Sequence, residues 1–160
     1  MRKFAVHTAV AMTLCSLAWP LAASEPSAEA VVSLSPAAMS AAATVDAFHV
    51  ALRTGDTKAA AALLADDALI FEAGGVEHGK AEYVARHLPA DVEFSKSAKS
   101  RITARAGDAN GNWAWVASEG RTTGTFKGKA IDQATTETML LRREGGAWKI
   151  VHIHWSSGRR

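Results

Sequence analysis

The sequence predicts an α+β fold in which one curved antiparallel sheet packs on three helices near the N-terminus. Two features lead to this prediction. Apolar residues recur mainly at helical spacing between residues 36 and 88, whereas from residue 100 onward they alternate with polar residues. Short segments rich in Gly, Asn and Lys divide this second part at hairpin length. Because helices precede a series of strands, a single sheet covered by a few helices is the simplest packing.

Each expected helix has a recognisable beginning or end. The Ser-Pro pair at residues 35–36 suits the N-cap and first position of a helix that Gly55 ends. A second, alanine-rich helix is expected at residues 57–64. A third helix is expected at residues 80–88 and should stop at Pro89.

The expected strands are marked by β-branched and aromatic residues and by the turns between them. A short strand precedes the third helix and ends in two glycines. The later strands form a meander, because the segments that join them are short enough for hairpins. The expected strands are residues 68–75, 100–107, 113–126, 130–144 and 148–157.

The first residues have the layout of a secretory signal peptide, with a basic start, an apolar run and small residues at its end. We expect removal of residues 1–24, a flexible lead-in at 25–35, a folded domain at 36–158 and a periplasmic or secreted location. A membrane anchor is the alternative, but His7 and Pro20 interrupt the run and no second apolar stretch follows.

Composition excludes several classes of function. The full chain has 18 basic and 16 acidic residues, and removal of Arg2 and Lys3 with the signal would make the two numbers equal. Cys15, the only cysteine, would be removed as well. The mature chain would then have neither a disulfide nor a thiolate metal site. It has no basic stripe for nucleic acid, no phosphate-binding loop, no dinucleotide fingerprint and no serine nucleophile elbow. We therefore expect no cofactor.

Four short motifs resemble one known superfamily. They are Gly-Asp at 55–56, Phe-Glu at 71–72, Val-Glu-His-Gly at 76–79 and ETMLLRREGGAWKIVHIH at 137–154. The chain is similar to the nuclear transport factor 2-like (SnoaL-like) superfamily, and within it to the association domain of calcium/calmodulin-dependent protein kinase II and its bacterial relatives. The resemblance implies a cone-shaped sheet that encloses a pocket, and a convex face that packs against a second copy.

The histidine pair near the C-terminus has two interpretations. Strict alternation would place four side chains on one face of the last strand: Trp148, Ile150, His152 and His154. The two imidazoles would lie about 6.6 Å apart along the strand, close enough to share a metal. A zinc site needs a third ligand, and no other expected strand offers His or Cys, so no metal is predicted. The resemblance places this face at a homodimer interface, which histidine would make pH-sensitive.

Candidate catalytic residues lie at the end of the third expected helix. Tyr83 and His87 are four residues apart and share a helix face, and Asp91 follows shortly after. Together they offer a hydrogen-bond donor and an acid–base pair. The alternative is a polar helix face that meets solvent.

The expected pocket is apolar and suited to a small apolar or aromatic molecule. Glu137 lies within an apolar strand, so its carboxylate would need a partner such as Arg121 or Arg143. A buried ion pair is a better explanation of this residue than catalysis. The residues expected to line the pocket are Phe71, Glu72, Trp115, Glu137, Met139 and Trp155.

Two functions remain open at this point. One is a binding or self-associating module without catalysis. The other is a cofactor-free SnoaL-like enzyme, such as an isomerase, dehydratase or cyclase, that uses a His/Asp or Tyr/Asp pair. A pocket with a desolvated His87 or aspartate would favour the enzyme, and a pocket filled by tryptophan would favour the module.

Overall fold

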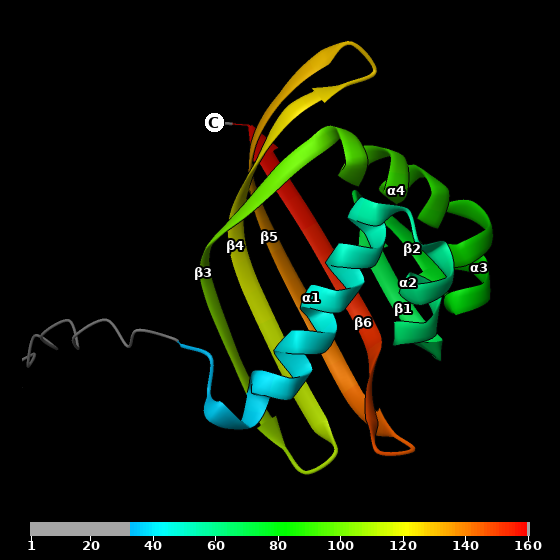
Figure 1. Ribbon diagram of the computed structural model, residues 1–160, viewed down its shortest axis with the longest axis vertical. Coiled ribbons are helices and arrows are strands. Elements are labelled where there is room, and N and C mark those ends of the chain that lie inside the picture. Colours follow the sequence, from blue (N-terminus) through cyan, green and yellow to red (C-terminus); the bar gives the residue numbers. More distant parts are fainter. Residues whose placement is uncertain (1–32, 160) are drawn as a thin grey trace, which may run out of the picture. The chain divides into compact units, whose positions relative to one another are not determined.

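The structure is a computed structural model that describes residues 33–159, so the predicted signal peptide and most of the lead-in lie outside the described residues. It confirms the predicted fold class: a curved, unclosed six-stranded sheet is packed against helices on its concave face (Figure 1). Among the described residues, no helix is both long and apolar enough to cross a membrane.

The helices begin and end largely where the sequence predicts. Ser35 caps the first of them through its hydroxyl, Gly55 ends α1 with a φ of 78°, and the Asp56 carboxylate accepts a hydrogen bond from the backbone of α2. The helical elements are a 3₁₀ helix η1 (Pro36–Ala38), α1 (Met39–Thr54), α2 (Thr57–Leu63), α3 (Lys80–Arg86) and α4 (Leu88–Ser97).

Helix α4 was not expected, because Pro89 was interpreted only as a helix terminator. Pro89 instead lies in the first turn of α4, where a residue without a backbone N–H is tolerated. His87 forms the junction: its N–H donates to the carbonyl of Tyr83, and its carbonyl accepts from the N–H of Asp91. The junction therefore holds the three predicted catalytic residues side by side.

The sheet order is β2-β1-β6-β5-β4-β3, in which β1 and β6 are parallel and all other neighbours are antiparallel. The short strand β2 had not been predicted, and it brings a second carboxylate-bearing segment beside α3. The strands are β1 (Leu64–Glu72), β2 (Gly75–His78), β3 (Ala98–Asn110), β4 (Trp113–Phe126), β5 (Lys129–Glu144) and β6 (Ala147–Arg159).

The core lies between α1 and the concave face of the sheet. The apolar stripe of α1, with Val45, Phe48 and Leu52, packs on buried side chains of the central strands, among them Met139 and Ile153. Figure 1 shows α1 lying across β5 and β6. Since this packing fills only part of the concave face, the rest of that face is left to form a cavity.

Strand β6 contains a bulge that reverses its alternation. Leu141 faces Ile150 across the ladder, whereas Leu140 faces His152, so Val151 is an additional residue without a partner of its own. One inserted residue moves every later side chain to the opposite face.

The bulge corrects the predicted face of β6. Trp148 and Ile150 are buried in the core, so the prediction that they share an exposed face with His152 and His154 is wrong. The rings of His152 and His154 lie beside Phe71 on the convex face, although His154 also borders the concave cavity that Trp155 lines.

Candidate functional site

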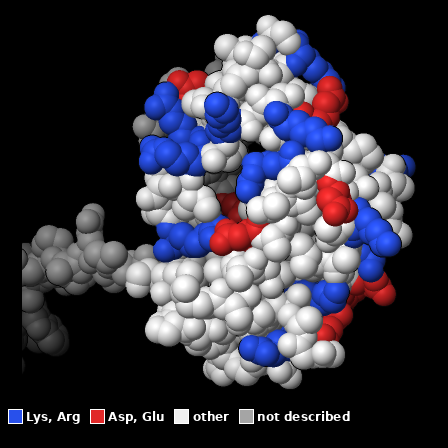
Figure 2. Space-filling model, in the orientation of Figure 1, with Lys and Arg blue, Asp and Glu red and all other residues white. Residues whose placement is uncertain are grey.

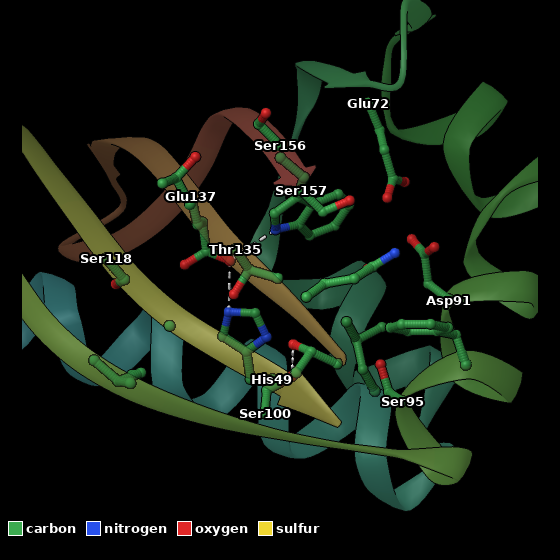
Figure 3. Close-up of a pocket in the computed structure, with 18 of the residues that line it drawn as sticks. His49, Glu72, Asp91, Ser95, Ser100, Ser118, Thr135, Glu137, Ser156 and Ser157 are labelled. Carbon is green, nitrogen blue, oxygen red and sulfur yellow. Dashed lines mark hydrogen bonds and ion pairs between the residues drawn. The ribbon is translucent and has the colours of Figure 1, made fainter. Parts of the chain in front are cut away.

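A cavity of about 800 Å³ lies between the concave face of the sheet and helices α1 and α4 (Figure 3). Figure 2 shows a hollow in the surface with acidic side chains inside it and basic side chains nearby. Trp155, Phe94 and Ile102 are apolar parts of the wall, but hydroxyl groups are frequent, so the cavity is mixed rather than apolar as predicted. The hydroxyl-bearing residues of the lining are Ser95, Ser100, Ser118, Thr122, Thr135, Thr136, Ser156 and Ser157.

One row of directly paired residues crosses five strands of the concave face. In the register of the ladders it runs Arg105, Ser118, Glu137, Trp155 and Glu72, from β3 to β1. Neighbouring strands are about 4.8 Å apart, which puts the backbones of Glu72 and Glu137 roughly 10 Å apart on either side of Trp155. The row thus presents two carboxylates to one cavity at separate points.

The first polar group is the His49 cluster, which consists of His49, Glu137 and Trp155. One oxygen of Glu137, Oε2, accepts hydrogen bonds from His49 Nε2 and from Trp155 Nε1, both at 2.7 Å. Glu137 is only 9% exposed, and its Oε1 has no hydrogen-bond partner among the described residues. Because His49 Nε2 is engaged by Glu137, its Nδ1 is the nitrogen left for a ligand.

The pKa of Glu137 reflects two opposing effects. Burial acts to raise the pKa, but the hydrogen bond and charge of His49, together with the Trp155 indole, outweigh it and hold the pKa below its usual value. Glu137 is therefore ionised at neutral pH and orients His49, as a carboxylate orients imidazole in many catalytic pairs.

The predicted partners of Glu137 are wrong. Arg121 forms a two-pronged pair with Asp132, at 2.6 and 2.7 Å. Arg143 lies over the ring of Trp148, with its guanidinium carbon 4.5 Å from the ring centroid. The buried pairing that Glu137 requires is provided by a helix residue instead.

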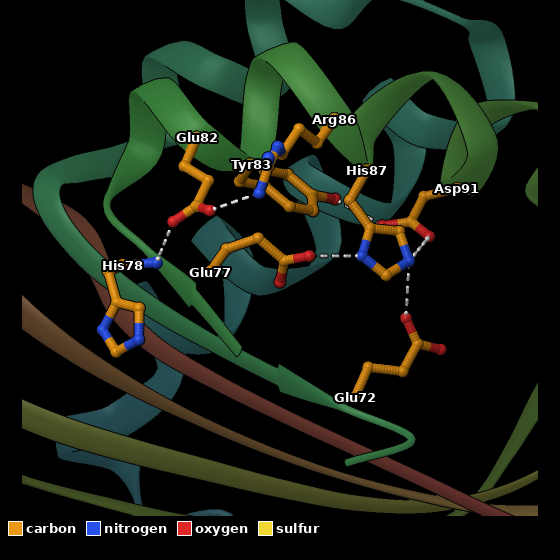
Figure 4. A network of polar contacts seen from close by, with 8 residues as sticks. All are labelled: Glu72, Glu77, His78, Glu82, Tyr83, Arg86, His87 and Asp91. Carbon is orange, nitrogen blue, oxygen red and sulfur yellow. Dashed lines mark hydrogen bonds and ion pairs between the residues drawn. The ribbon is translucent and has the colours of Figure 1, made fainter. Parts of the chain in front are cut away.

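The second polar group is the His87 cluster, which consists of Glu72, Glu77, Tyr83, His87 and Asp91 (Figure 4). His87 Nδ1 lies 2.6 Å from Glu77 Oε1, and its Nε2 lies 3.2 Å from Glu72 Oε2 and 3.6 Å from Asp91 Oδ1. Tyr83 donates its hydroxyl to Asp91 Oδ2 at 2.7 Å. One imidazole therefore faces three carboxylates that come from β1, β2 and α4.

Burial and neighbouring charges in the His87 cluster raise the pKa values of Glu72, Asp91 and His87. Burial raises the pKa of Glu72, and the charges of Asp91 and Glu77 add to the effect. Burial also raises the pKa of Asp91, although the Tyr83 hydrogen bond and His87 oppose it. Burial acts to lower the pKa of His87, but the hydrogen bond to Glu77 and the three carboxylate charges raise it. The cluster thus retains protons that isolated groups would lose.

The structure brings the predicted catalytic residues Tyr83, His87 and Asp91 into one network, and Asp91 also lines the cavity. Of the residues expected to line the pocket, Glu72, Glu137 and Trp155 do so.

The other three expected pocket residues lie elsewhere. Phe71 packs against His152 and His154, with ring centroids 4.9 and 6.2 Å apart, on the convex face. Trp115 is partly exposed and lines a separate shallow hollow of about 200 Å³. Met139 is fully buried in the core beneath α1. Phe71 adjoins Glu72 in β1, so strand alternation already places the two side chains on opposite faces. The burial of Met139 could not be predicted, because local sequence does not say which part of a strand a helix covers.

Two residues that carry the site were missed. His49 lies four residues after the buried Val45, at the edge of the apolar stripe of α1, a position that could have drawn attention to it. Glu77 lies on β2, which was not predicted. It belongs to the Val-Glu-His-Gly motif at 76–79, but that motif served only for the family resemblance and gave Glu77 no role.

Glu72, His87 and Asp91 could together bind a metal ion, because each offers a ligand atom and these atoms lie within 4.8 Å of one another. We find no other group of three or more such residues in residues 33–159. Two carboxylates and an imidazole would suit a borderline or hard divalent cation. A proton on His87 satisfies the same three groups, so the geometry by itself does not require a metal.

Comparison with known proteins assigns the chain to a family. A model of the SnoaL-like domain matches residues 41–159, almost the whole described region. The chain belongs to the SnoaL-like domain family. No curated protein sequence matches this SnoaL-like chain.

Solved structures agree with this assignment. A candidate ketosteroid isomerase from Shewanella frigidimarina is 35% identical to the SnoaL-like chain, with a TM-score of 0.71 over 73% of this chain and 94% of that one. A candidate calcium/calmodulin-dependent protein kinase II association domain from Xanthomonas campestris is 24% identical, with a TM-score of 0.63 over 74% and 85%. A candidate dehydratase from Streptomyces avermitilis is 17% identical, with a TM-score of 0.63 over 74% and 94%. The last two show the fold alone.

Proposed function

We propose that this chain is a cofactor-independent enzyme that moves protons on a small molecule held in the cavity. One observation carries the proposal: carboxylates with opposite pKa shifts face the same cavity. The pKa of Glu137 is lowered, whereas the pKa values of Glu72 and Asp91 are raised. Pairs of groups whose environments separate their pKa values are typical of acid and base partners in catalysis.

The roles follow from these shifts. His49, oriented by the ionised Glu137, offers its Nδ1 to take a proton from a substrate carbon. Protonated Glu72 or Asp91 can return a proton at a second position. Return to another carbon shifts a double bond, and delivery to a hydroxyl releases water and leaves a double bond. Both outcomes balance atoms and electrons without a further reagent.

Three other observations support catalysis rather than binding alone. Trp155 forms part of the wall and leaves about 800 Å³ open, so tryptophan does not fill the pocket. Asp91, 15% exposed, is the desolvated acid expected of an enzyme. A relative that is 35% identical is named as a candidate ketosteroid isomerase, which is proton-transfer chemistry of this kind. The mixed lining suits a carbonyl compound with polar groups better than a purely apolar ligand.

Deuterium exchange tests the proposal without knowledge of the natural substrate. A panel of β,γ-unsaturated ketones and β-hydroxy ketones is incubated with the protein in D₂O and followed by NMR. We expect deuterium at carbons next to the carbonyl, and a rate about 100-fold or more lower in His49→Gln or Glu72→Gln. Glu93→Gln, an exposed position on α4, is the matched control and should keep the full rate. Ligands that raise the melting temperature without any exchange would show a binding module instead.

A further inference from the structure

Glu77 is a buried carboxylate that has one hydrogen-bond partner among the described residues. Its Oε1 lies 2.6 Å from His87 Nδ1, while its Oε2 is buried without a partner. The side chain is 13% exposed and is absent from the cavity lining. A carboxylate removed from water needs compensation. Here the compensation comes from His87, so the two groups hold each other in place.

The contact with Glu77 fixes which nitrogen of His87 is directed toward the cavity carboxylates. With Nδ1 directed at β2, Nε2 is directed at two residues of the cavity wall, 3.2 Å from Glu72 Oε2 and 3.6 Å from Asp91 Oδ1. Neither contact is a hydrogen bond in this structure, so each proton transfer requires the carboxylate to move closer to Nε2. Figure 4 shows Glu77 on one side of the imidazole and the other two carboxylates at its opposite nitrogen. Asp91 is itself held by the Tyr83 hydroxyl, which leaves its Oδ1 toward His87.

We propose that Glu77 is a positioning residue: it keeps the Nδ1–H of His87 toward β2, so that Nε2 passes one proton between Glu72 and Asp91. In each transfer the Nε2–H bond breaks as an O–H bond forms on one carboxylate, and Nε2 then takes the proton of the other. The electron pairs stay on the same three groups, so no oxidant or reductant is needed.

This inference rests on the proposed function for its catalytic consequence. In the proposed reaction one cavity carboxylate, Glu72 or Asp91, returns a proton to the substrate. His87 can then reprotonate that carboxylate and take the proton of the other. Glu77 touches neither the cavity nor the reacting atoms and acts only through the imidazole.

Four elements contribute groups that bear on the protonation of His87. β1 provides Glu72, β2 provides Glu77, α3 provides Tyr83 and α4 provides Asp91. No lysine or arginine forms an ion pair with these carboxylates in the part of the chain that the structure describes. A neutral acceptor at position 77 would keep a hydrogen bond but remove the charge that makes Nδ1 the preferred site of the proton.

The experiment is an NMR titration of the full chain labelled with ¹⁵N-histidine, with a chelator present so that no metal contributes. In the wild type, neutral His87 should carry its proton on Nδ1, the less common tautomer in free histidine. In Glu77→Gln this preference should be lost, and the pKa of His87 should fall. Glu82→Gln is the matched control, because Glu82 pairs with Arg86 and the His78 backbone and does not contact His87.

Three results would overturn the proposal: a wild-type His87 with its proton on Nε2, a titration unchanged by Glu77→Gln, or an equal change in Glu82→Gln. Should Glu77→Gln fail to fold, the wild-type tautomer still decides, and Glu77→Asp, which keeps the charge but withdraws it, should reduce the Nδ1–H preference. These measurements use no substrate. A protein without exchange activity but with the Nδ1–H tautomer would disprove the proposed function and keep the role of Glu77.

Discussion

The His49 cluster and the His87 cluster adjoin the same cavity, yet they shift the pKa values of their carboxylates in opposite directions. Glu137 is the most buried of the cavity carboxylates, at 9% exposed against 15% for Asp91 and 36% for Glu72, and its pKa alone of these three is lowered. The extent of burial therefore does not decide the direction. The direction instead depends on the hydrogen-bond donors and the charges around each carboxylate.

The difference can be stated in terms of hydrogen bonds and charge. Glu137 receives two N–H donors and has no other carboxylate in its cluster. In the His87 cluster, one imidazole serves Glu72, Glu77 and Asp91, so each carboxylate also feels the charge of the others. The two donors lower the pKa of Glu137, whereas burial and neighbouring negative charge raise the pKa values of Glu72 and Asp91.

The largest effect is expected from removing the carboxylate of the His49 cluster. Glu137→Ala takes away the acceptor of both His49 and the Trp155 indole, and should lower the free energy of unfolding by about 2–4 kcal/mol. Urea unfolding at pH 7 measures it. Glu119→Ala, at an exposed site on the neighbouring strand, should change stability by less than about 0.5 kcal/mol. Equal effects of the two substitutions would contradict the importance of the buried pair.

A smaller effect is expected from the matching hydrogen bond of the His87 cluster. Tyr83→Phe keeps the buried ring but removes the hydroxyl donated to Asp91, and should cost about 1–2 kcal/mol at neutral pH. Because that hydrogen bond lowers the pKa of Asp91, its loss should raise this pKa further. Carboxyl chemical shifts of Asp91 across pH report the change, and an unaltered titration would count against the contact.

The pH dependence of stability should differ in sign between the clusters. The folded-state pKa of Asp91 is raised, so its contribution is greatest at low pH and is lost as pH rises through the folded value. The folded-state pKa of Glu137 is lowered, so its contribution is present above the unfolded value, near 4.5, and is lost as pH falls through the folded value.

Denaturant unfolding of two variants from acid to neutral pH separates these signs. The stability lost in Asp91→Asn should shrink, or become a gain, as pH rises. The stability lost in Glu137→Gln should grow as pH rises from the acid side through about 4.5. Parallel pH profiles for the two variants would refute the contrast.

On the convex face, His152 and His154 differ from His49 and His87 because they form no ion pair with a carboxylate among the described residues. His152 and Leu69 pair in register, and Leu140 and Trp115 continue this row across β5 and β4 with partly exposed side chains. We propose that this face forms a homodimer, because an apolar strip of this kind is suited to burial against a second copy.

The proposed dimer should depend on pH. Neither His152 nor His154 has a carboxylate within ion-pair distance among residues 33–159, so charging them in an interface costs desolvation without compensation. Light scattering should find a dimer at pH 7.5 that loosens as pH falls through the histidine range. A monomer at micromolar concentration and neutral pH would rule out the interface.

Local sequence determined much of the architecture and part of the site. Ser35, Gly55 and Asp56 mark helix ends because their side chains or backbone freedom satisfy the ends directly. The four-residue spacing of Tyr83 and His87 placed them together because a helix repeats at that interval. Such features depend only on neighbours along the chain, so they can be predicted before the fold is known.

Only the tertiary structure decided the remaining features. Pro89 suits the start of a helix as well as its end, and no local residue marks the extra position at Val151 that reverses the faces of β6. Glu137 meets His49 from a distant helix, and Glu77 meets His87 through a strand that pairs only in the folded sheet. The protonation of a buried carboxylate depends on which donors and charges surround it, and here folding brings them from remote parts of the chain.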